Sequence, residues 1–365
     1  MALLSSFLNK NTTYTKRYDL AQLLSGHAPI YSQYGQDIYA SDLVQMAIDC
    51  IATEMSKLQP KHIRTNADGS QEIPRSSLNR LFKFSPNPLM TTSDFLEKIT
   101  WLLYMNYNVF IYPVFEAVVK NGVEIKKEYK AFYPLNPVSV EFLQDSTGKL
   151  FVKFTFSGGD EFTLPYDSVI HIRKKYSINE IMGGGMNGQP DNEPLRKILR
   201  VNETVVDGLG RAVATSLTVR GILKINTMLD DEKMQAERRS FEEAIRRSES
   251  GILPIDLKGE YIDLRPDPKL LDSETLSFIQ NRILYWYGVP LKILAGDFSD
   301  KEYQAFYEKT LEPLMISFGR AFSATLFTQR ELDFGNEIVF YNRDMMYPST
   351  ETKLKLLEVA GQQGV

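Results

Sequence analysis

The stretch that decides the fold is residues 272–327, which read DSETLSFIQNRILYWYGVPLKILAGDFSDKEYQAFYEKTLEPLMISFGRAFSATLF. Within Ser273–Tyr287 the apolar side chains recur at helical spacing, which predicts an amphipathic helix. Asp272 is placed to cap this helix. Gly288-Val289-Pro290 ends it, because glycine tolerates the terminating geometry and proline cannot extend a helix. The apolar stripe consists of Leu276, Ile279, Ile283, Leu284 and Tyr287.

A second helix is expected after a loop that is both apolar and charged, Leu291–Phe298. The helix begins at Ser299-Asp300-Lys301-Glu302, which has the spacing of a capping box. Pro313 lies inside its apolar stripe and has no backbone N–H, so we expect a kink there rather than a straight rod. A loop held between two helix ends can be presented to something that moves past it.

Composition limits the class of protein. The 365 residues suffice for about two domains, and 43% hydrophobic residues suffice for a buried core. The net charge of −4 gives no basic footprint, which disfavours tight nonspecific binding to nucleic-acid phosphates over the molecule as a whole. The single cysteine, Cys50, excludes an intramolecular disulfide and a cysteine zinc site, and we expect it to be a small core residue on a helix.

No targeting or membrane segment is expected. Residues 1–10 lack a basic start followed by a sustained apolar run. The most apolar window, Trp101–Phe115, is interrupted by polar residues and a proline and is too short to span a bilayer. We therefore expect a protein made in a reducing compartment, with no membrane partner.

The first half is predicted to be an α+β domain with a mostly antiparallel sheet. Residues 1–40 are expected to form an extended arm, and Asn121-Gly122 is a hairpin signal. Helices are predicted from Ser41 to about Leu58, near Leu78–Phe82, and from Thr92 or Ser93. Strands are predicted at Val109–Phe115, Val138–Phe142, Leu150–Phe156, Glu161–Leu164 and Val169–Arg173.

The second half is predicted to contain a long helix and a compact insert. A linker at 176–193 leads to a helix that Asp191 or Asn192 caps and that runs to about Ser216. Its apolar edge is narrow, which suits packing against a neighbouring helix of this chain or of another subunit. The insert has a strand near 219–225, a helix at Asp231–Arg247 and a hairpin at 252–264. Beyond Phe327 we expect a strand at Glu337–Tyr341 and a helix starting at Lys353–Val359.

The signals for catalysis are weak. The Gly183–Gly188 loop precedes a helix and could cradle phosphate, but it lacks Gly-Lys-Ser/Thr and the dinucleotide pattern, so a pivoting linker is favoured. The histidines His27, His62 and His171 form no local metal pair, and we expect His171 on the polar face of its strand. We predict no catalytic residue, no cofactor and no metal site.

The helix Asp231–Arg247 carries a basic cluster interleaved with glutamates, namely Arg238, Arg239, Arg246 and Arg247. One interpretation is a solvated helix face, supported by glutamate–arginine pairs four residues apart. The other is a docking face for a protein partner. The acidic run Asp230-Asp231-Glu232 is interpreted as helix-start charge rather than a metal cage.

The motifs at the two ends of the opening loop resemble the portal proteins of tailed double-stranded DNA bacteriophages, the long-tailed type. Members carry a helix that ends in aromatic-Gly-Val-Pro, a loop, and a helix that contains Thr-Leu-x-Pro. Here these are Tyr287-Gly288-Val289-Pro290 and Thr310-Leu311-Glu312-Pro313. Further matches occur in order along the chain at Pro86-Asn87-Pro88, Asn108-Val109-Phe110, Leu135-Asn136-Pro137, Val169–Arg173 and Glu193-Pro194-Leu195. Tyr107 stands where the family usually has glycine.

The resemblance implies a structural ring protein and a division of the chain into named parts. Residues 1–190 would form the outer wing, 191–218 and 265–289 the stem helices, and 219–264 the clip. Residues 290–300 would be the tunnel loop that faces DNA, followed by a long kinked helix at 301–328. Residues 329–365 would return to the wing and begin a short or truncated crown.

The resemblance also implies partners and a location. Twelve subunits would form a ring at one capsid vertex, through which viral DNA is packaged and ejected. The other partners would be the terminase large subunit, which hydrolyses ATP in place of this chain, the major capsid protein and a head-completion or adaptor protein. The protein would belong to the virion and would be assembled in the host bacterial cytoplasm.

Within the tunnel loop and the start of the next helix, we expect Leu291, Lys292, Asp297 and Lys301 to lie at the channel, and the clip arginines to dock partners. Two other hypotheses remain. One is a nucleotide- or DNA-processing enzyme that uses the Gly183–Gly188 loop. The other is a non-viral scaffold module, which would form rings without packaging partners.

Overall fold

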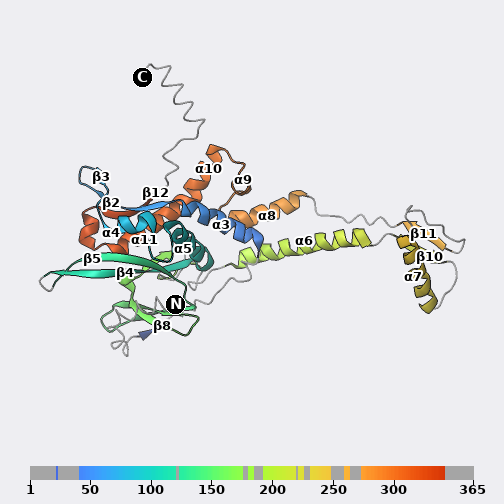
Figure 1. Ribbon diagram of the computed structural model, residues 1–365, viewed down its shortest axis with the longest axis horizontal. Helices are drawn as coiled ribbons and strands as arrows, with labels where there is room; N and C mark the ends of the chain where they lie inside the picture. The colour runs from blue at the N-terminus through green and yellow to red at the C-terminus, as the bar shows by residue number, and fades with distance from the viewer. Residues whose placement is uncertain are drawn as a thin grey trace, which may run out of the picture. The chain divides into compact units, whose positions relative to one another are not determined.

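The computed structural model describes residues 22–23, 41–120, 123–175, 180–184, 192–218, 221–225, 231–247, 259–263 and 273–341 (Figure 1). The chain divides into two compact units. Unit 1 consists of Met1–Lys197 and Asn281–Val365, and unit 2 of Ile198–Gln280. Both boundaries fall inside helices. None of the helices in the described part of the chain has the length and hydropathy needed to cross a bilayer.

Three helices open unit 1, close to where the sequence predicts them. They are α3 (Asp42–Ser56), α4 (Ser77–Phe84) and α5 (Thr92–Asn106), and α3 packs against α5. The predicted stripe of α3 is buried. The cap of α5 is Thr91, not Thr92 or Ser93: Thr91 and Asp94 form a capping box, and Thr92 is already helical.

Two antiparallel sheets follow α5. In the first, β4 (Asn108–Lys120) lies between β5 (Val123–Leu135) and β9 (Ile170–Arg173). Lys120 pairs with Val123, so the strands flank the predicted turn, although Asn121 and Gly122 themselves lie outside the described residues. The second sheet has the order β1-β6-β7-β8, with bounds Gln22–Leu23, Ser139–Gln144, Leu150–Thr155 and Glu161–Pro165.

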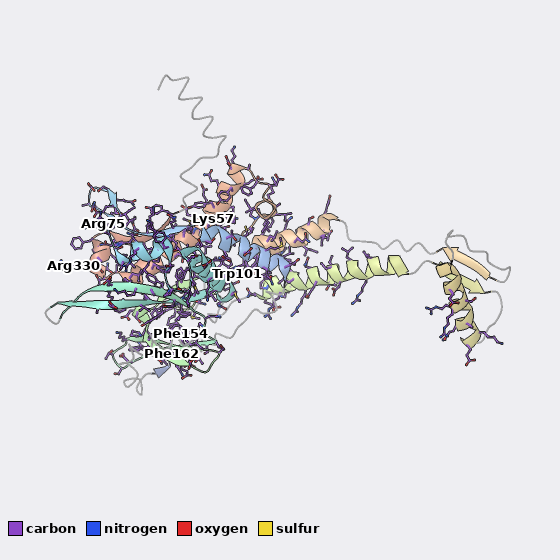
Figure 2. All side chains as sticks on the ribbon, viewed as in Figure 1. Lys57, Arg75, Trp101, Phe154, Phe162 and Arg330 are labelled. Atoms are coloured by element: carbon purple, nitrogen blue, oxygen red, sulfur yellow. The ribbon has the colours of Figure 1, made fainter. Side chains whose placement is uncertain are left out.

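The α+β prediction is confirmed, but the predicted single sheet is wrong. The two sheets share an aromatic core in which the rings of Phe110 on β4 and Phe154 on β7 lie 5.2 Å apart. Phe162 lies on β8 of the same sheet as Phe154 (Figure 2). The packing of one sheet on the other therefore buries the apolar faces that a single sheet would leave exposed. Of the predicted arm, only β1 is described.

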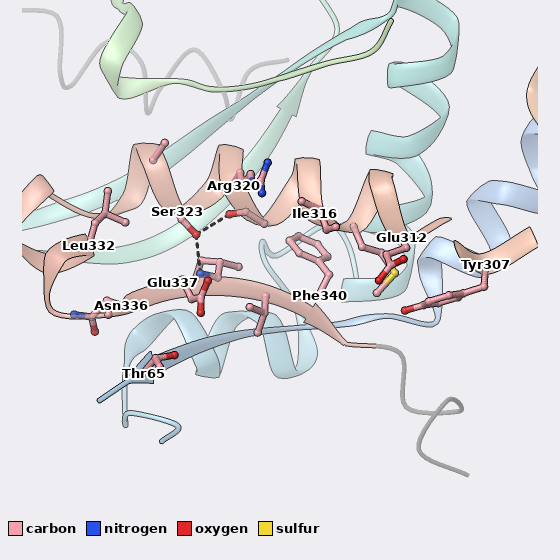
Figure 3. A pocket seen from close by; sticks show the side chains of 16 residues that line it. Thr65, Tyr307, Glu312, Ile316, Arg320, Ser323, Leu332, Asn336, Glu337 and Phe340 are labelled. Carbon is pink, nitrogen blue, oxygen red and sulfur yellow. Dashed lines mark hydrogen bonds between the residues drawn. The ribbon is translucent and has the colours of Figure 1, made fainter. Parts of the chain in front are cut away.

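A third sheet joins distant parts of the chain. It has the order β12-β2-β3, with bounds Asn336–Tyr341, Gln59–Thr65 and Gln71–Glu72. The helix α11 (Glu312–Leu326) covers β12: Ser323 Oγ accepts from the Ile338 N–H at 2.8 Å and donates to the Gly319 carbonyl (Figure 3). A Cβ on Gly319 would lie 2.7 Å from the Ile338 carbonyl oxygen, so glycine permits this approach.

The long helix after residue 299 is interrupted, as predicted, but the irregularity precedes the proline. It consists of α10 (Asp300–Phe306), a π-helical segment (Tyr307–Leu311) and α11, in whose first turn Pro313 lies. A proline is tolerated in a first turn because the N–H it lacks would have no regular partner there. The short helix α12 (Gln329–Asp333) then leads to β12.

Unit 2 contains most of α6 (Glu193–Thr218) and the compact insert. In the insert, β10 (Gly221–Ile225) pairs antiparallel with β11 (Gly259–Asp263), and α7 (Asp231–Arg247) has the predicted bounds. A hairpin was predicted at 252–264. Its described part, β11, pairs with β10 instead, and residues 252–258 and 264 lie outside the described residues. The same holds for Asp272 and for residues 342–365, which include the predicted helix at 353–359.

Candidate functional site

The centre of the candidate site is the turn between α8 (Ser273–Tyr287) and the segment after it. Gly288 has φ +75°, a left-handed conformation that glycine adopts without strain. Val289 is completely buried. A Cβ on Gly288 would lie only 2.7 Å from Thr310 Oγ1. Both the backbone angle and the available space therefore require glycine at this position.

The turn is bonded to the π-helical segment. Thr310 Oγ1 donates to the Gly288 carbonyl at 2.8 Å, and Leu311 beside it is buried. The two sequence motifs, Tyr287–Pro290 and Thr310–Pro313, therefore meet at one junction. Everything between them, residues 291–309, forms an excursion that leaves and returns at this hydrogen bond.

The predicted tunnel loop is not an open loop throughout. Pro290 caps a short helix, α9 (Leu291–Ala295), which ends at Gly296 in the left-handed conformation with φ +72°. The Asp297 N–H donates to the Lys292 carbonyl at 3.1 Å, which closes the helical turn. The Pro290–Ala295 half of the segment is thus ordered by local backbone bonds, for which the Gly296 terminator is the sequence signal.

An ion pair joins the two ends of this excursion. Lys292 Nζ donates to Glu302 Oε1, while the other oxygen of Glu302 accepts from the Ser299 N–H and hydroxyl at 2.9 Å each. The predicted capping box at Ser299 is confirmed. The hydrogen bond from Lys292, and then those from Ser299, lower the pKa of Glu302 to about 2. The hydrogen bond to Glu302 raises the pKa of Lys292.

Two of the predicted channel residues, Lys292 and Asp297, are joined by the backbone hydrogen bond that closes α9. Leu291, Lys292, Asp297 and Lys301 are all exposed. Lys301 forms no ion pair with any described residue. Their position at a channel remains a prediction.

Sequence reasoning missed the contacts that hold α10 against the rest of unit 1. Tyr303 Oη donates to Glu54 Oε2 of α3 at 2.8 Å, and the rings of Tyr303 and Phe298 stack at 5.5 Å. Phe306 is buried. A polar residue paired with a tyrosine almost 250 positions away leaves no local signal in the sequence.

A second junction lies within unit 1, at the start of α6 and the end of α8. Tyr107, the residue at the family's usual glycine, has φ +55° and its hydroxyl donates to Asn192 Oδ1 at 2.7 Å, just before α6. Lys175 lies over the ring of Trp286 in α8 at 3.7 Å. Burial lowers the pKa of the adjacent Lys174 to about 8.

The described part of the Gly183–Gly188 loop is packed against protein. Asn108 accepts from the Gly183 N–H at 2.7 Å and donates to its carbonyl at 3.0 Å. A Cβ on Gly184 would lie 2.4 Å from the Tyr107 ring. These glycines serve close packing, and the Gly183 N–H is not available to a phosphate. Residues 185–188 lie outside the described residues.

The half-buried His171 has a structural environment, and it alternates along β9 with the fully buried Ile170 and Ile172, on the strand face that it shares with exposed Arg173. His171 stacks on Phe110 at 4.2 Å, and burial lowers its pKa to about 3. Its Nε2 donates to Asn108 Oδ1 at 3.1 Å, because that oxygen can only accept, and its Nδ1 accepts from the Tyr166 hydroxyl at 2.9 Å. A neutral imidazole with both nitrogens bonded is held in place rather than poised to transfer a proton.

The other candidates for chemistry are also accounted for. Burial is the main cause that raises the pKa of Cys50 to about 11, so its thiol is not poised as a nucleophile. In the described ranges, no group of three His, Cys, Asp or Glu could hold a metal ion. A pocket of about 720 Å³ lies along α11 and β12, where the Ser323 bond ties the two elements together (Figure 3).

The clip arginines are partly described. Arg238 and Arg239 are exposed on α7, and Arg246 and Arg247 belong to the same helix, although their side chains lie outside the described set. The mean hydropathy of α7 is low, as expected of a helix with one narrow apolar edge. Docking of a partner on this helix remains a prediction.

Comparison with known proteins defines the class. The sequence model of the phage portal protein family matches residues 43–365, and the chain belongs to this family. The family is one of structural proteins. The probable portal proteins of Lactococcus phages p2 and SK1 are each 22% identical over 320 residues, which cover 84% of this chain and 71% of each relative.

Solved structures show the same fold. The neck of an empty gene transfer agent (GTA) particle, computed with C6 symmetry, contains a chain that superposes with a TM-score of 0.65 at 15% identity. That alignment covers 95% of this chain and 92% of the other. The neck of the native particle, computed with C12 symmetry, gives a TM-score of 0.64 at 13% identity, with coverage of 93% and 92%. The fold of helices and antiparallel sheets is therefore that of a portal protein.

Proposed function

We propose that the chain is a portal subunit that forms a ring of twelve at one capsid vertex, through which viral DNA enters and leaves. Membership of the family supports the portal role, and the C12 symmetry of the similar neck supports the number of subunits. In this proposal the protein resides in the virion and is assembled in the host cytoplasm. It contacts DNA, the terminase large subunit, the major capsid protein and a head-completion protein.

The proposed parts follow the boundaries expected from the sequence. Residues 1–190 form the wing, to which 329–365 return before a short crown. Residues 191–218 and 265–289 are stem helices, 219–264 the clip, and 301–328 the interrupted helix. The compact insert between the long helices supports the clip assignment, because it belongs to a separate unit.

One observation carries the channel assignment: the excursion 291–309 leaves and returns at the Gly288–Thr310 bond. Its first part, residues 290–300, has one lysine against two aspartates, and that lysine is paired with Glu302. A channel that passes DNA should not grip it, because each phosphate contact adds salt-dependent affinity. A segment whose basic charge is already compensated satisfies this requirement.

Native mass measurement and negative-stain imaging of the full chain test the ring. We expect rings with a central hole and the mass of twelve chains. Rings without packaging partners would also suit a scaffold module, so they must be tested further in packaging. A monomer that binds nucleotide, with turnover abolished by Gly185→Ala, would favour the enzyme hypothesis instead.

A charge reversal tests the channel position. We expect Lys292→Glu to lower the yield of packaged genomes or their retention several-fold while rings still assemble, because it places a carboxylate against Glu302 and toward DNA. Lys292→Arg should package normally, since it keeps both the charge and the ion pair. Lys98→Glu makes the same charge change at an exposed position of α5, outside the excursion 291–309, and serves as the control. Normal packaging by Lys292→Glu would contradict the channel assignment.

A further inference from the structure

A groove of about 770 Å³ lies on unit 1 between α4 and the chain segment that leads into it, residues 73–76. Two large apolar side chains on its walls face solvent: Ile73 is 60% exposed and Phe84 is 67% exposed. Figure 2 shows Arg75 at the periphery of unit 1, where the chain passes from β3 to α4. This surface takes no part in the junction of Gly288 and Thr310.

The exposure of Phe84 is not required by the packing of its helix. Leu78 and Phe82 form the buried face of α4. Ser77, Arg80 and Phe84 recur at i, i+3 and i+7, and they line the groove on the opposite face. A polar side chain at position 84 would be compatible with the packing of α4. Apolar side chains that cluster on a surface indicate a binding site more often than scattered ones do.

The groove is basic. Arg75, Arg80 and Lys83 line it, and none of them forms an ion pair with a described residue. Lys83 lies over the Phe84 ring, with its ammonium 5.0 Å from the centroid. The acidic residue of the groove, Glu128, pairs with Lys130 at 3.1 Å, so the three cations are left without a compensating charge inside the groove.

The walls of the groove are fixed before anything binds. Asn79 Nδ2 donates to the Pro74 carbonyl at 2.8 Å and to the His62 carbonyl of β2 at 2.9 Å, while its Oδ1 accepts from the His62 N–H at 2.8 Å. Ser76 caps α4 through the Asn79 N–H. The segment 73–76 is therefore held beside the first turn of α4. Little conformational entropy would be lost when a ligand binds there, because the site is already ordered.

We propose that this groove binds an acidic segment of a partner protein, with an apolar side chain seated between Ile73 and Phe84 and carboxylates beside Arg75, Arg80 and Lys83. Charge complementarity selects the occupant. The parts of this chain outside the described residues at its ends do not fit: residues 1–40 carry three basic residues against two acidic ones, and residues 342–365 carry three of each. Nucleic acid would use the cations but not the aliphatic Ile73.

The test uses the full-length protein and a fluorescent synthetic peptide in which glutamates flank a Leu-Ala-Phe core. Binding is followed by anisotropy at low and physiological salt. A peptide with lysines in place of the glutamates, and one with glycines in place of the apolar core, serve as ligand controls. We expect binding of the acidic apolar peptide that weakens with salt, and at least about fivefold weaker binding of both controls.

Two variants locate the site. Arg80→Glu with Lys83→Glu, and separately Phe84→Ser, should each weaken binding by about tenfold. All three side chains are exposed, so circular dichroism should show a folded protein in each case. The matched control, Lys98→Glu with Lys309→Glu, makes the same change of net charge elsewhere and should bind like the unmodified protein.

Three results would overturn the proposal. One is equal binding by the groove variants and the matched control. Another is preference of the groove for duplex DNA over the acidic peptide. The last is a loss of oligomer mass on reversing Arg80 and Lys83, which would show that a second copy of this chain occupies the groove. None of these outcomes bears on whether residues 290–300 face a channel, so the two proposals fail separately.

Discussion

Gly288 is the residue at which the path of the candidate channel segment is set. Its left-handed angle and its distance from Thr310 act together, whereas Gly296, with nearly the same φ of +72°, has no atom within 4 Å of a Cβ built on it. The two glycines therefore separate two costs. Replacing Gly296 by alanine would carry only the conformational cost of a left-handed backbone. Replacing Gly288 would carry that cost and a steric one.

We expect Gly288→Ala to lower the free energy of unfolding by more than Gly296→Ala does. The shared conformational cost is about 1–2 kcal/mol. Gly288→Ala also displaces the Thr310 hydroxyl and the hydrogen bond it makes. Chemical denaturation of both variants measures the difference, and Thr310→Ala should recover part of the steric loss in the Gly288→Ala background, because it removes the side-chain oxygen that the new Cβ would meet. Equal destabilisation by the two alanines would contradict this account of the turn.

At the scale of elements, Glu302 links the start of α10 to α9. Its pKa in the folded protein is lowered, so the stability it contributes is present above the ordinary glutamate value of 4.5 and is lost as the pH falls toward about 2. The pKa of Lys292 is raised, and its contribution is lost only at alkaline pH. The ion pair and the cap therefore persist across the neutral range.

We expect amide exchange in the first turn of α10 to stay slow down to about pH 4 and to rise, relative to the intrinsic rate, as the pH approaches 2. Glu302→Gln should exchange faster at every pH in that range and lose the pH dependence. Glu308→Gln, an exposed residue outside the cap, is the control. Hydrogen exchange with mass spectrometry of the peptide covering residues 298–306 decides between these outcomes.

Local pattern predicts elements well but not the bonds between them. The bounds of α7 and the Ser299 capping box follow from periodicity and spacing, which act within a few residues. The pairing of β12 with β2 joins Asn336 to Arg64, and no local pattern encodes a register over that separation. The Thr310–Gly288 hydrogen bond is equally absent from any local pattern. The sequence shows the proline but not this bond, so local reasoning predicts the kink at Pro313, whereas the irregular segment lies just before it.

At the scale of the whole molecule, α6 has an apolar edge that the described part of the chain leaves exposed. Val206, Leu209 and Val213 recur at i, i+3 and i+7, and their side chains are 52%, 40% and 49% exposed. A helix of 26 residues that exposes such a stripe gains little stability from it alone. In the proposed ring, neighbouring copies would cover this edge, and its burial would stabilise the assembly rather than the subunit.

We therefore expect Leu209→Glu to shift the protein from rings toward smaller species while leaving the unfolding of unit 1 unchanged. Each covered leucine contributes about 1.5–3 kcal/mol, and the loss is repeated at every contact around the ring. Thr204→Glu introduces the same charge at an exposed position of α6 outside the stripe, and it should leave the ring mass unchanged. Mass photometry over a dilution series measures the shift. Because the stripe acts only between copies, a ring that withstands dilution equally well with Leu209→Glu would mean that α6 is not part of the subunit interface. The ring would then have to be held by other parts of the chain.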